Sequence, residues 1–271
     1  MHQQKTNHGM WHFKIILLMC MLFSGGLSAA VTLAADDAFT IMVEDAAPPW
    51  SKNDGTGYAN DVVVAAFKEM AVEVQLKVVP YARCKHLVLN GNAVACFNMT
   101  WLPEFEGKIK LASLPIHAVN NDIFENINAP LPKPPHGTCS LPRGTIVGVA
   151  RGYEYSSQAT SLNVSGVVFE SANSDLLSLK KLAAGRLPAA LITTSDLEVT
   201  SQRTMQSDAV NDVQFAFNCG QVALTIGFSL AHPDGLRALK IYDEGYRRIE
   251  ANGELRRIHM RWFPRQRVGQ P

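Results

Sequence analysis

The chain of 271 residues carries 25 Lys and Arg against 24 Asp and Glu, which gives a formal net charge of +1. Because this balance provides no excess of basic charge, we expect neither nucleic acid nor an anionic membrane surface as a partner. The length allows one large domain or two modest lobes, each with its own apolar core.

The first 35 residues have the layout of a secretory signal peptide. Lys5 and Lys14 precede an unbroken apolar run over 15–23, and small residues then offer cleavage after Ala30 or Ala35. The alternative is a retained membrane anchor, but the apolar run is much shorter than the roughly 20 residues that a spanning helix needs. We therefore expect residues 1–35 to be removed and the rest to be exported.

The next segment alternates between predicted strands and predicted helices. Apolar residues alternate with polar ones over 39–43 and 74–78, which indicates two strands, and the apolar stretch 93–97 indicates a buried third strand. A helix capped by Asn60 or Asp61 and ending near Val72 lies between the first two strands, and a short helix over 83–90 precedes the third. This order is typical of a parallel sheet with crossover helices.

A proline-rich segment, 130–135, interrupts this pattern, which then resumes. Further strands are predicted over 145–149, 167–169, 187–192, 213–217 and 222–228. Further helices are predicted over 173–184 with Asn173 or Ser174 as cap, over 195–205, over 233–252 with Pro233 in the first turn, and finally up to Trp262 and Phe263. We predict an α/β protein of two lobes, each a mostly parallel sheet flanked by helices.

Four cysteines lie beyond residue 35, and an even number in an exported protein indicates disulfides. Three pairings are open, and proximity in the sequence favours Cys84–Cys96 and Cys139–Cys219. The spacings contain no Cys-x-x-Cys or paired-His pattern, so we expect no metal and no other cofactor.

Ligands of open parallel sheets bind beyond the carboxyl ends of the strands, which directs attention to the loops 44–58, 98–106, 150–155 and 193–196. Trp50 and Trp101 offer flat rings for stacking a ligand, unless they only pack on their own loops. Trp262 is interpreted as structural. The other candidate ligand-binding residues are polar or charged: Tyr81, Arg83, Asn98, Thr100, Arg151, Tyr153, Thr193 and Asp196. Each has an ordinary alternative, a surface ion pair for the arginines and a loop cap for the short side chains.

Several segments together resemble the bacterial extracellular solute-binding proteins of family 3. The resemblance covers nearly all of 38–264 and rests on the order and spacing of short motifs. These are Pro48-Pro49-Trp50, Gly57-Tyr58-Ala59-Asn60-Asp61, Pro80-Tyr81-Ala82-Arg83, Gly148-Val149-Ala150-Arg151-Gly152, Gly185-Arg186-Leu187 and Gly253-Glu254-Leu255.

The resemblance implies a two-lobed periplasmic binding protein of type II, with a two-strand hinge near 118–122 and 221–225. The first lobe would comprise 36–120 and 223–271, and the second would comprise 121–222. The protein would act as a monomer that delivers a small polar solute, such as an amino acid, to an ABC transporter. Relatives on the same scaffold serve as sensing modules or as enzymes, and an enzyme would need a carboxyl group such as that of Glu104, Glu106 or Glu154.

The chain departs from the family where an amino acid is usually held. By spacing, the arginine that clamps the ligand carboxylate is replaced by Glu106, and the acid that holds the ligand ammonium is replaced by Thr193. Arg83 and Arg151 are candidate replacements for the anion clamp. The candidates for binding a cation are acidic: Glu44, Asp45, Glu104 and Asp196.

We predict that export removes residues 1–30 or 1–35, because the small residues at both places suit a signal peptidase. Intact-mass measurement of protein recovered from the periplasm of a bacterial host checks this. Full-length protein that stays in the membrane fraction would contradict the prediction and favour the anchor.

Overall fold

The computed structural model describes residues 38–135, 138–195 and 211–264, which form a mixed α/β fold. The predicted signal peptide lies outside the described residues, and so does nearly all of the helix predicted over 195–205. None of the helices that the structure describes is long and apolar enough to cross a membrane.

A nine-stranded sheet forms the centre of the fold, with the order β4-β1-β5-β11-β7-β10-β8-β9 and with β6 beside β11. The strands are β1 (Phe39–Glu44), β4 (Val74–Val79), β5 (Ala95–Met99), β6 (Ile109–Leu111), β7 (His117–Asn126), β8 (Ile146–Ala150), β9 (Val168–Ala172), β10 (Ala189–Thr194) and β11 (Val213–Ser229). At one end β4, β1 and β5 are parallel, and at the other end β10, β8 and β9 are parallel. The sheet therefore has two parallel halves, which we call the first half and the second half.

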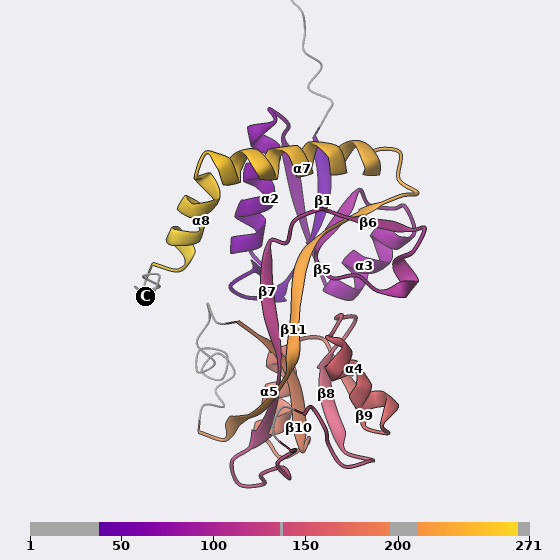
Figure 1. Cartoon of the computed structure of the whole chain (residues 1–271), viewed down its shortest axis with the longest axis vertical. Coiled ribbons are helices and arrows are strands. Elements are labelled where there is room, and N and C mark those ends of the chain that lie inside the picture. Colours follow the sequence, from indigo (N-terminus) through magenta and orange to yellow (C-terminus); the bar gives the residue numbers. More distant parts are fainter. Residues whose placement is uncertain (1–37, 136–137, 196–210, 265–271) are drawn as a thin grey trace, which may run out of the picture. The chain divides into compact units, whose positions relative to one another are not determined.

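Two long antiparallel strands, β7 and β11, join these halves (Figure 1). They pair from Val213 opposite Asn126 to Leu224 opposite His117, and the last residues of β11 then pair with β5 and β6. The residue pattern did not indicate the strand β7, because its sequence is too polar to show an apolar alternation. Only the family resemblance implied a strand there, in the hinge near 118–122.

The structure also corrects the prediction of separate strands over 213–217 and 222–228, which are one strand. The register shifts between Asn218 and Gln221, where Gly220 has a φ of +93° and its N–H donates to Asn218 Oδ1. This bulge interrupts the apolar pattern while the pairing with β7 continues.

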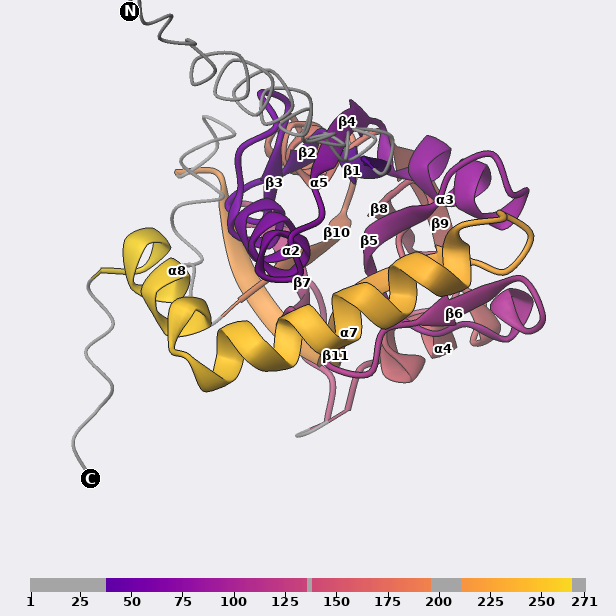
Figure 2. The same ribbon diagram turned by 90° about the horizontal axis from the view of Figure 1, so that it is seen from above.

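Helices cover the sheet, and a short hairpin, β2 (Ala46–Ala47) and β3 (Ser51–Lys52), follows β1. The helices are α2 (Tyr58–Glu69), α3 (Tyr81–Leu89), α4 (Ser157–Val164), α5 (Asp175–Ala183), α7 (Gly235–Ala251), α8 (Glu254–Trp262) and the 3₁₀ turn η1 (Pro103–Phe105). The helix α7 crosses α2 (Figure 2) at Gly245, where a Cβ would lie 1.9 Å from the Ala66 carbonyl oxygen. Only glycine therefore fits at this crossing. The helix α4 was not predicted, because its sequence is only weakly amphipathic.

The predicted cap of α5 is confirmed at Ser174, whose Oγ accepts from the Leu177 N–H. The predicted cap of α2 is wrong, because that helix begins at Tyr58 after Gly57 and has no side-chain cap. The side chain of Asn60 instead donates to the Gly55 carbonyl at 2.7 Å. The helix α7 begins at Gly235, so Pro233 precedes the helix instead of lying in its first turn.

Asp61 connects α2 to the last helix. Its Oδ2 accepts a hydrogen bond from Trp262 Nε1 at 2.8 Å. This contact agrees with the structural interpretation of Trp262.

Each half has its own apolar core. The first half buries Phe67, Phe228 and Tyr242 among β1, α2 and α7. The second half buries Leu162 and Leu191, together with other apolar residues of β7, β8 and α4.

Both expected disulfides are present, Cys84–Cys96 between α3 and β5 and Cys139–Cys219 between the segment after the proline-rich stretch and β11. The first lies in the first half, and the second joins two segments of the second half. Neither bond crosses between the halves.

We predict that the loss of Cys139–Cys219 destabilises the protein more than the loss of Cys84–Cys96. The two bonds close loops with sequence separations of 80 and 12 residues. In a chain-entropy model these loops correspond to about 4.5 and about 3 kcal/mol. Urea unfolding of the two paired Cys→Ser variants checks the order, and a larger loss for the Cys84–Cys96 pair would contradict it.

Candidate functional site

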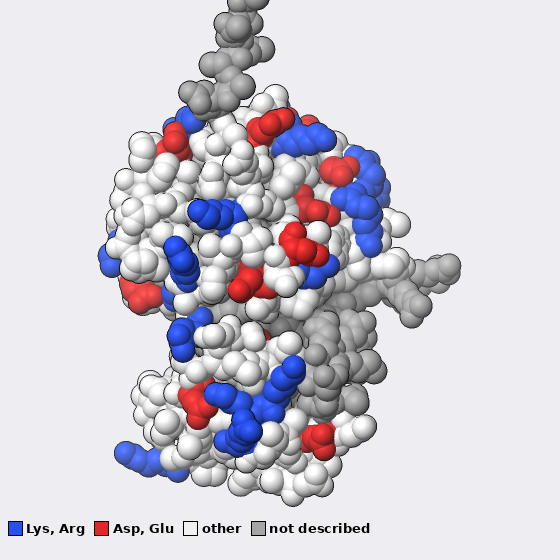
Figure 3. All heavy atoms as spheres, turned by 180° about the vertical axis from the view of Figure 1, so that it is seen from behind, with Lys and Arg blue, Asp and Glu red and all other residues white. Residues whose placement is uncertain are grey.

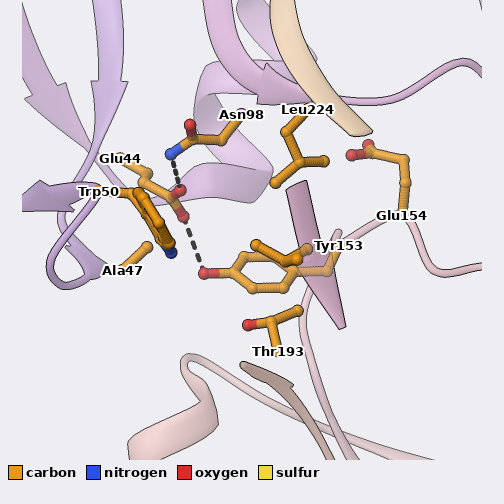
Figure 4. Close-up of a pocket in the computed structure, with 9 residues that line it drawn as sticks. Glu44, Ala47, Trp50, Asn98, Tyr153, Glu154, Thr193 and Leu224 are labelled. Carbon is orange, nitrogen blue, oxygen red and sulfur yellow. Dashed lines mark hydrogen bonds between the residues drawn. The ribbon is translucent and has the colours of Figure 1, made fainter. Parts of the chain in front are cut away.

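A pocket lies where the first half of the sheet meets the second (Figure 4). Its lining residues come from β1, β2, β5, β7, β10, β11 and two loops: Glu44, Ala47, Trp50, Asn98, Val119, Tyr153, Glu154, Thr193 and Leu224. The space among them is about 20 Å³, which is about what one buried water molecule needs. A larger solute can therefore enter only if the side chains or the two halves move apart.

Glu44, the last residue of β1, is the polar centre of this pocket. Its carboxylate is 3% exposed and accepts from Asn98 Nδ2 at 2.5 Å and from the Tyr153 hydroxyl at 2.8 Å. Figure 4 shows both donors pointing at the carboxylate. The two hydrogen bonds engage both oxygens of the carboxylate.

Asn98 adopts an uncommon backbone conformation, with a φ of +64°. Asparagine tolerates this left-handed region better than most residues. The conformation occurs within β5, at the position from which the Asn98 side chain reaches Glu44. Backbone strain of this kind concentrates at functional sites.

A second set of contacts joins the halves through Glu154. Its carboxylate accepts from the Tyr81 hydroxyl at 2.5 Å and lies 3.1 Å from Lys85 Nζ, and both partners belong to α3. Burial raises the pKa of Glu154, although the Lys85 charge opposes the shift. Burial, as the larger cause, and the nearby Glu154 carboxylate, as the second, raise the pKa of Tyr81 well above its usual value. The phenol therefore stays protonated and acts as the hydrogen-bond donor to Glu154.

Gly152 adds an apolar contact beside these groups. Its φ is +85°, and a Cβ there would lie 3.1 Å from the Ala82 Cα. The helix α3 therefore approaches the backbone closely at this glycine.

Trp50 forms one wall of the pocket and is 2% exposed. It stacks on His117, with ring centroids 4.0 Å apart and planes 10° from parallel, and Tyr58 meets its edge. Burial lowers the pKa of His117 to about 3, so the imidazole is neutral at pH 7. His117 thus supports the wall of the site.

Thr193 also reaches the pocket, but its polar atoms are committed to α5. Its N–H donates to Asp175 Oδ2 at 2.9 Å, and its hydroxyl donates to the same oxygen. The position where the family would place an acid therefore contacts an acid from a neighbouring helix.

The structure brings together only part of the predicted site. Trp50, Asn98, Tyr153 and Thr193 line the pocket, and Tyr81 contacts it through Glu154. Five other candidates do not line the pocket. Arg83, Glu106 and Arg151 are exposed, Trp101 is 56% exposed, and Thr100 is half-buried. Asp196 lies outside the described residues.

The sequence suggested Glu44 only as one of several acids and Glu154 only for an enzyme. A signal was available for Glu44, because it ends the first strand and precedes the loop to Trp50. No pattern marked Glu154, whose partners Tyr81 and Lys85 are distant in the chain.

Charges of both signs are scattered over the face drawn in Figure 3, between broad uncharged areas. On this face no extended region has a single sign. Among the described residues no group of three or more His, Cys, Asp or Glu could hold a metal ion.

We predict that protonation of His117 destabilises the fold in acid. The folded-state pKa is about 3, against 6.5 for an ordinary histidine, so the unfolded chain takes up the proton first as the pH falls below 6.5. The cost between pH 7 and pH 5 should be about 2 kcal/mol. Urea unfolding of His117→Phe, which keeps a ring against Trp50, should show a weaker loss of stability over this range.

The same change at the exposed His86 of α3 is the control for that experiment. It should leave the pH dependence of the wild-type protein unchanged. Equal pH dependence in His117→Phe and the wild-type protein would contradict the prediction.

No protein-family model matches the chain, and no curated protein matches it either. Solved structures do match. A histidine kinase sensor domain with similarity to periplasmic binding proteins is 16% identical with a TM-score of 0.68, covering 87% of this chain and all of that one. The arginine-, lysine-, histidine-binding protein ArtJ from Geobacillus stearothermophilus is 13% identical with a TM-score of 0.67. The alignment covers 85% of this chain and 97% of that one.

A third match is the ancestral amino acid-binding protein AncCDT-1, a precursor of cyclohexadienyl dehydratase. It is 15% identical with a TM-score of 0.61, and the alignment covers 84% of this chain and 96% of that one. At these identities the likeness concerns the fold alone. The chain has the two-lobed α/β fold of the periplasmic binding proteins.

Proposed function

We propose that this protein captures a small polar solute in the pocket between the two halves of its sheet. The observation that carries the proposal is the hydrogen bond between Tyr153 of the second half and Glu44 of the first, across a pocket walled by both. A solute that binds Glu44 would replace this contact. Binding would thus be coupled to the spacing of the halves.

Entry of the solute requires an opening movement, because the space present is about 20 Å³. The paired stretch of β7 and β11 around Asn120 and Gln221 is the natural place for it, since these strands continue from one half into the other. The corresponding lobes would be 36–120 with 223–271, and 121–222. The single chain would work as a monomer.

The proposed site of action is the periplasm. Two disulfides support it, because such bonds persist in oxidising compartments, and the signal-peptide pattern of residues 1–35 agrees. There the protein would deliver its solute to the permease of an ABC transporter. Presentation to a sensory receptor would use the same pocket and the same opening.

An enzyme on this scaffold is a second candidate because Glu154 lies in the pocket lining with a raised pKa. A buried carboxyl group of this kind can act as a general acid or base. Conversion of the bound solute by the wild-type protein, lost in Glu154→Gln while binding remains, would favour catalysis.

We predict that a polar metabolite stabilises the protein in a thermal-shift screen. A ligand at 100 times its Kd adds about 2.7 kcal/mol to the free energy of unfolding, which for a domain of this size is about 5–10 °C in Tm. Glu44→Gln should greatly reduce the shift, because it alters the carboxylate at which the solute would replace the Tyr153 hydroxyl. Trp101→Ala, which removes an exposed aromatic outside the pocket, should preserve it.

The screen should include amines, amino acids, organic acids, small peptides, sugars and polyols. The absence of any shift across these classes would overturn the proposal. Equal losses in the Glu44 and Trp101 variants would place the solute elsewhere.

A further inference from the structure

The edge of the Trp50 ring is the part of this residue that the pocket can use. One face of the indole stacks on His117 at 4.0 Å, and the rings of Tyr58 and Phe263 pack around it with centroids 5.8 and 5.7 Å away. The side chain is only 2% exposed. A solute in the pocket therefore meets the edge of the indole more readily than its face.

The indole N–H at that edge is a buried donor without an acceptor. Trp50 Nε1 lacks a hydrogen-bond partner although the residue lines the pocket. Figure 4 shows this nitrogen on the side of the ring that faces the Tyr153 hydroxyl. Because an unpaired buried donor is costly, Trp50 Nε1 is placed to donate to an acceptor atom on a solute.

The place beside this donor already receives a hydroxyl group. The Tyr153 hydroxyl donates there to the Glu44 carboxylate at 2.8 Å. Tyr153 belongs to the second half, whereas Trp50, Glu44 and the Asn98 side chain that donates to Glu44 all belong to the first half. When the halves move apart, an accepting oxygen of Glu44 and the Trp50 N–H remain beside the space that the phenol hydroxyl has left.

A hydroxyl on the solute can serve both of these groups with a single atom. It donates its hydrogen to Glu44 and accepts from Trp50 Nε1. An ammonium group has no lone pair for the indole, and a carboxylate has no hydrogen for Glu44, so either would satisfy one group only. Asn98 Oδ1, a second buried atom without a partner, needs a donor, which a further hydroxyl can supply.

We propose that the solute is a polyhydroxylated molecule, a sugar or a polyol, with one hydroxyl in the place of the Tyr153 hydroxyl. That hydroxyl donates to Glu44 and accepts from Trp50 Nε1. The contact needs an accepting oxygen on Glu44 and does not need an uncompensated charge. This inference rests on the proposed binding function and specifies the class of its ligand.

The test measures affinities by calorimetry on the wild-type protein lacking residues 1–35. The hydroxylated compounds are glucose, galactose, xylose, myo-inositol and sorbitol, and the comparison compounds are arginine, glutamine, putrescine and glutarate. We expect at least one hydroxylated compound to bind, and to bind at least tenfold more tightly than every comparison compound.

For each hydroxylated compound that binds, deoxy and deoxyfluoro analogues then replace one hydroxyl at a time. At one position the deoxy analogue should bind at least about tenfold more weakly, because the buried indole and Glu44 both lose a partner. The deoxyfluoro analogue should lose nearly as much, since fluorine carries no hydrogen for Glu44.

Trp50→Phe removes the indole N–H and keeps an aromatic ring against His117. It should weaken binding of the parent compound about tenfold. It should also reduce the further loss caused by the decisive deoxy change, because the two changes remove the same hydrogen bond. Trp101→Phe, the same change at an exposed tryptophan outside the pocket lining, is the matched control and should leave the affinity within about twofold. Equal effects of the two variants would overturn the role of Trp50.

The outcomes separate the two proposals. An amino acid, putrescine or glutarate that binds more tightly than any hydroxylated compound would keep the binding function and overturn the hydroxylated ligand. A sugar or polyol whose analogues all keep its affinity would overturn the hydroxyl at Glu44. No binding by any compound would overturn both proposals. The analogue series uses the unaltered protein, so it decides the question even if Trp50→Phe does not fold.

Discussion

The antiparallel pairing of β7 with β11 is the constraint on which the rest of the fold depends. Through it, two sets of parallel strands with separate cores belong to one sheet. Backbone hydrogen bonds along these strands fix how the loops of each half meet, since slippage by one residue would turn every side chain to the opposite face. The pocket lies where this pairing passes from one half to the other, with Val119 of β7 and Leu224 of β11 in its wall.

Polar contacts between the halves then determine how the site is arranged. Glu44 and Glu154 sit on opposite halves, and each accepts a tyrosine hydroxyl from the other side, Tyr153 and Tyr81 respectively. Both disulfides lie within a half, so neither bond ties one half to the other.

Much of the fold could be predicted from local patterns, and the site only in part. Alternation and capping identified β1, β4, β5 and α5, because their apolar faces and the Ser174 cap are visible within a few residues of sequence. Local pattern missed the strand β7, which only the resemblance implied as a hinge strand near 118–122, because its polar residues are satisfied by partners far along the chain. Trp50 and Asn98 were found because the sequence places them in loops expected at the carboxyl ends of strands, although the structure includes Asn98 in β5. Glu154 instead depends on α3, about 70 residues away, which no local pattern records.

The hydrogen bond between Tyr153 and Glu44 also has a consequence for the affinity with which the proposed solute could bind. A hydroxyl carried by the chain itself competes with any incoming group for the same carboxylate, at an effective concentration set by its attachment. Under the proposed binding, this internal competitor would raise the external concentration at which half of the pockets are occupied, without changing the hyperbolic form of the binding curve. A tyrosine opposite Glu44 would thus lower the apparent affinity for any solute that binds at this carboxylate.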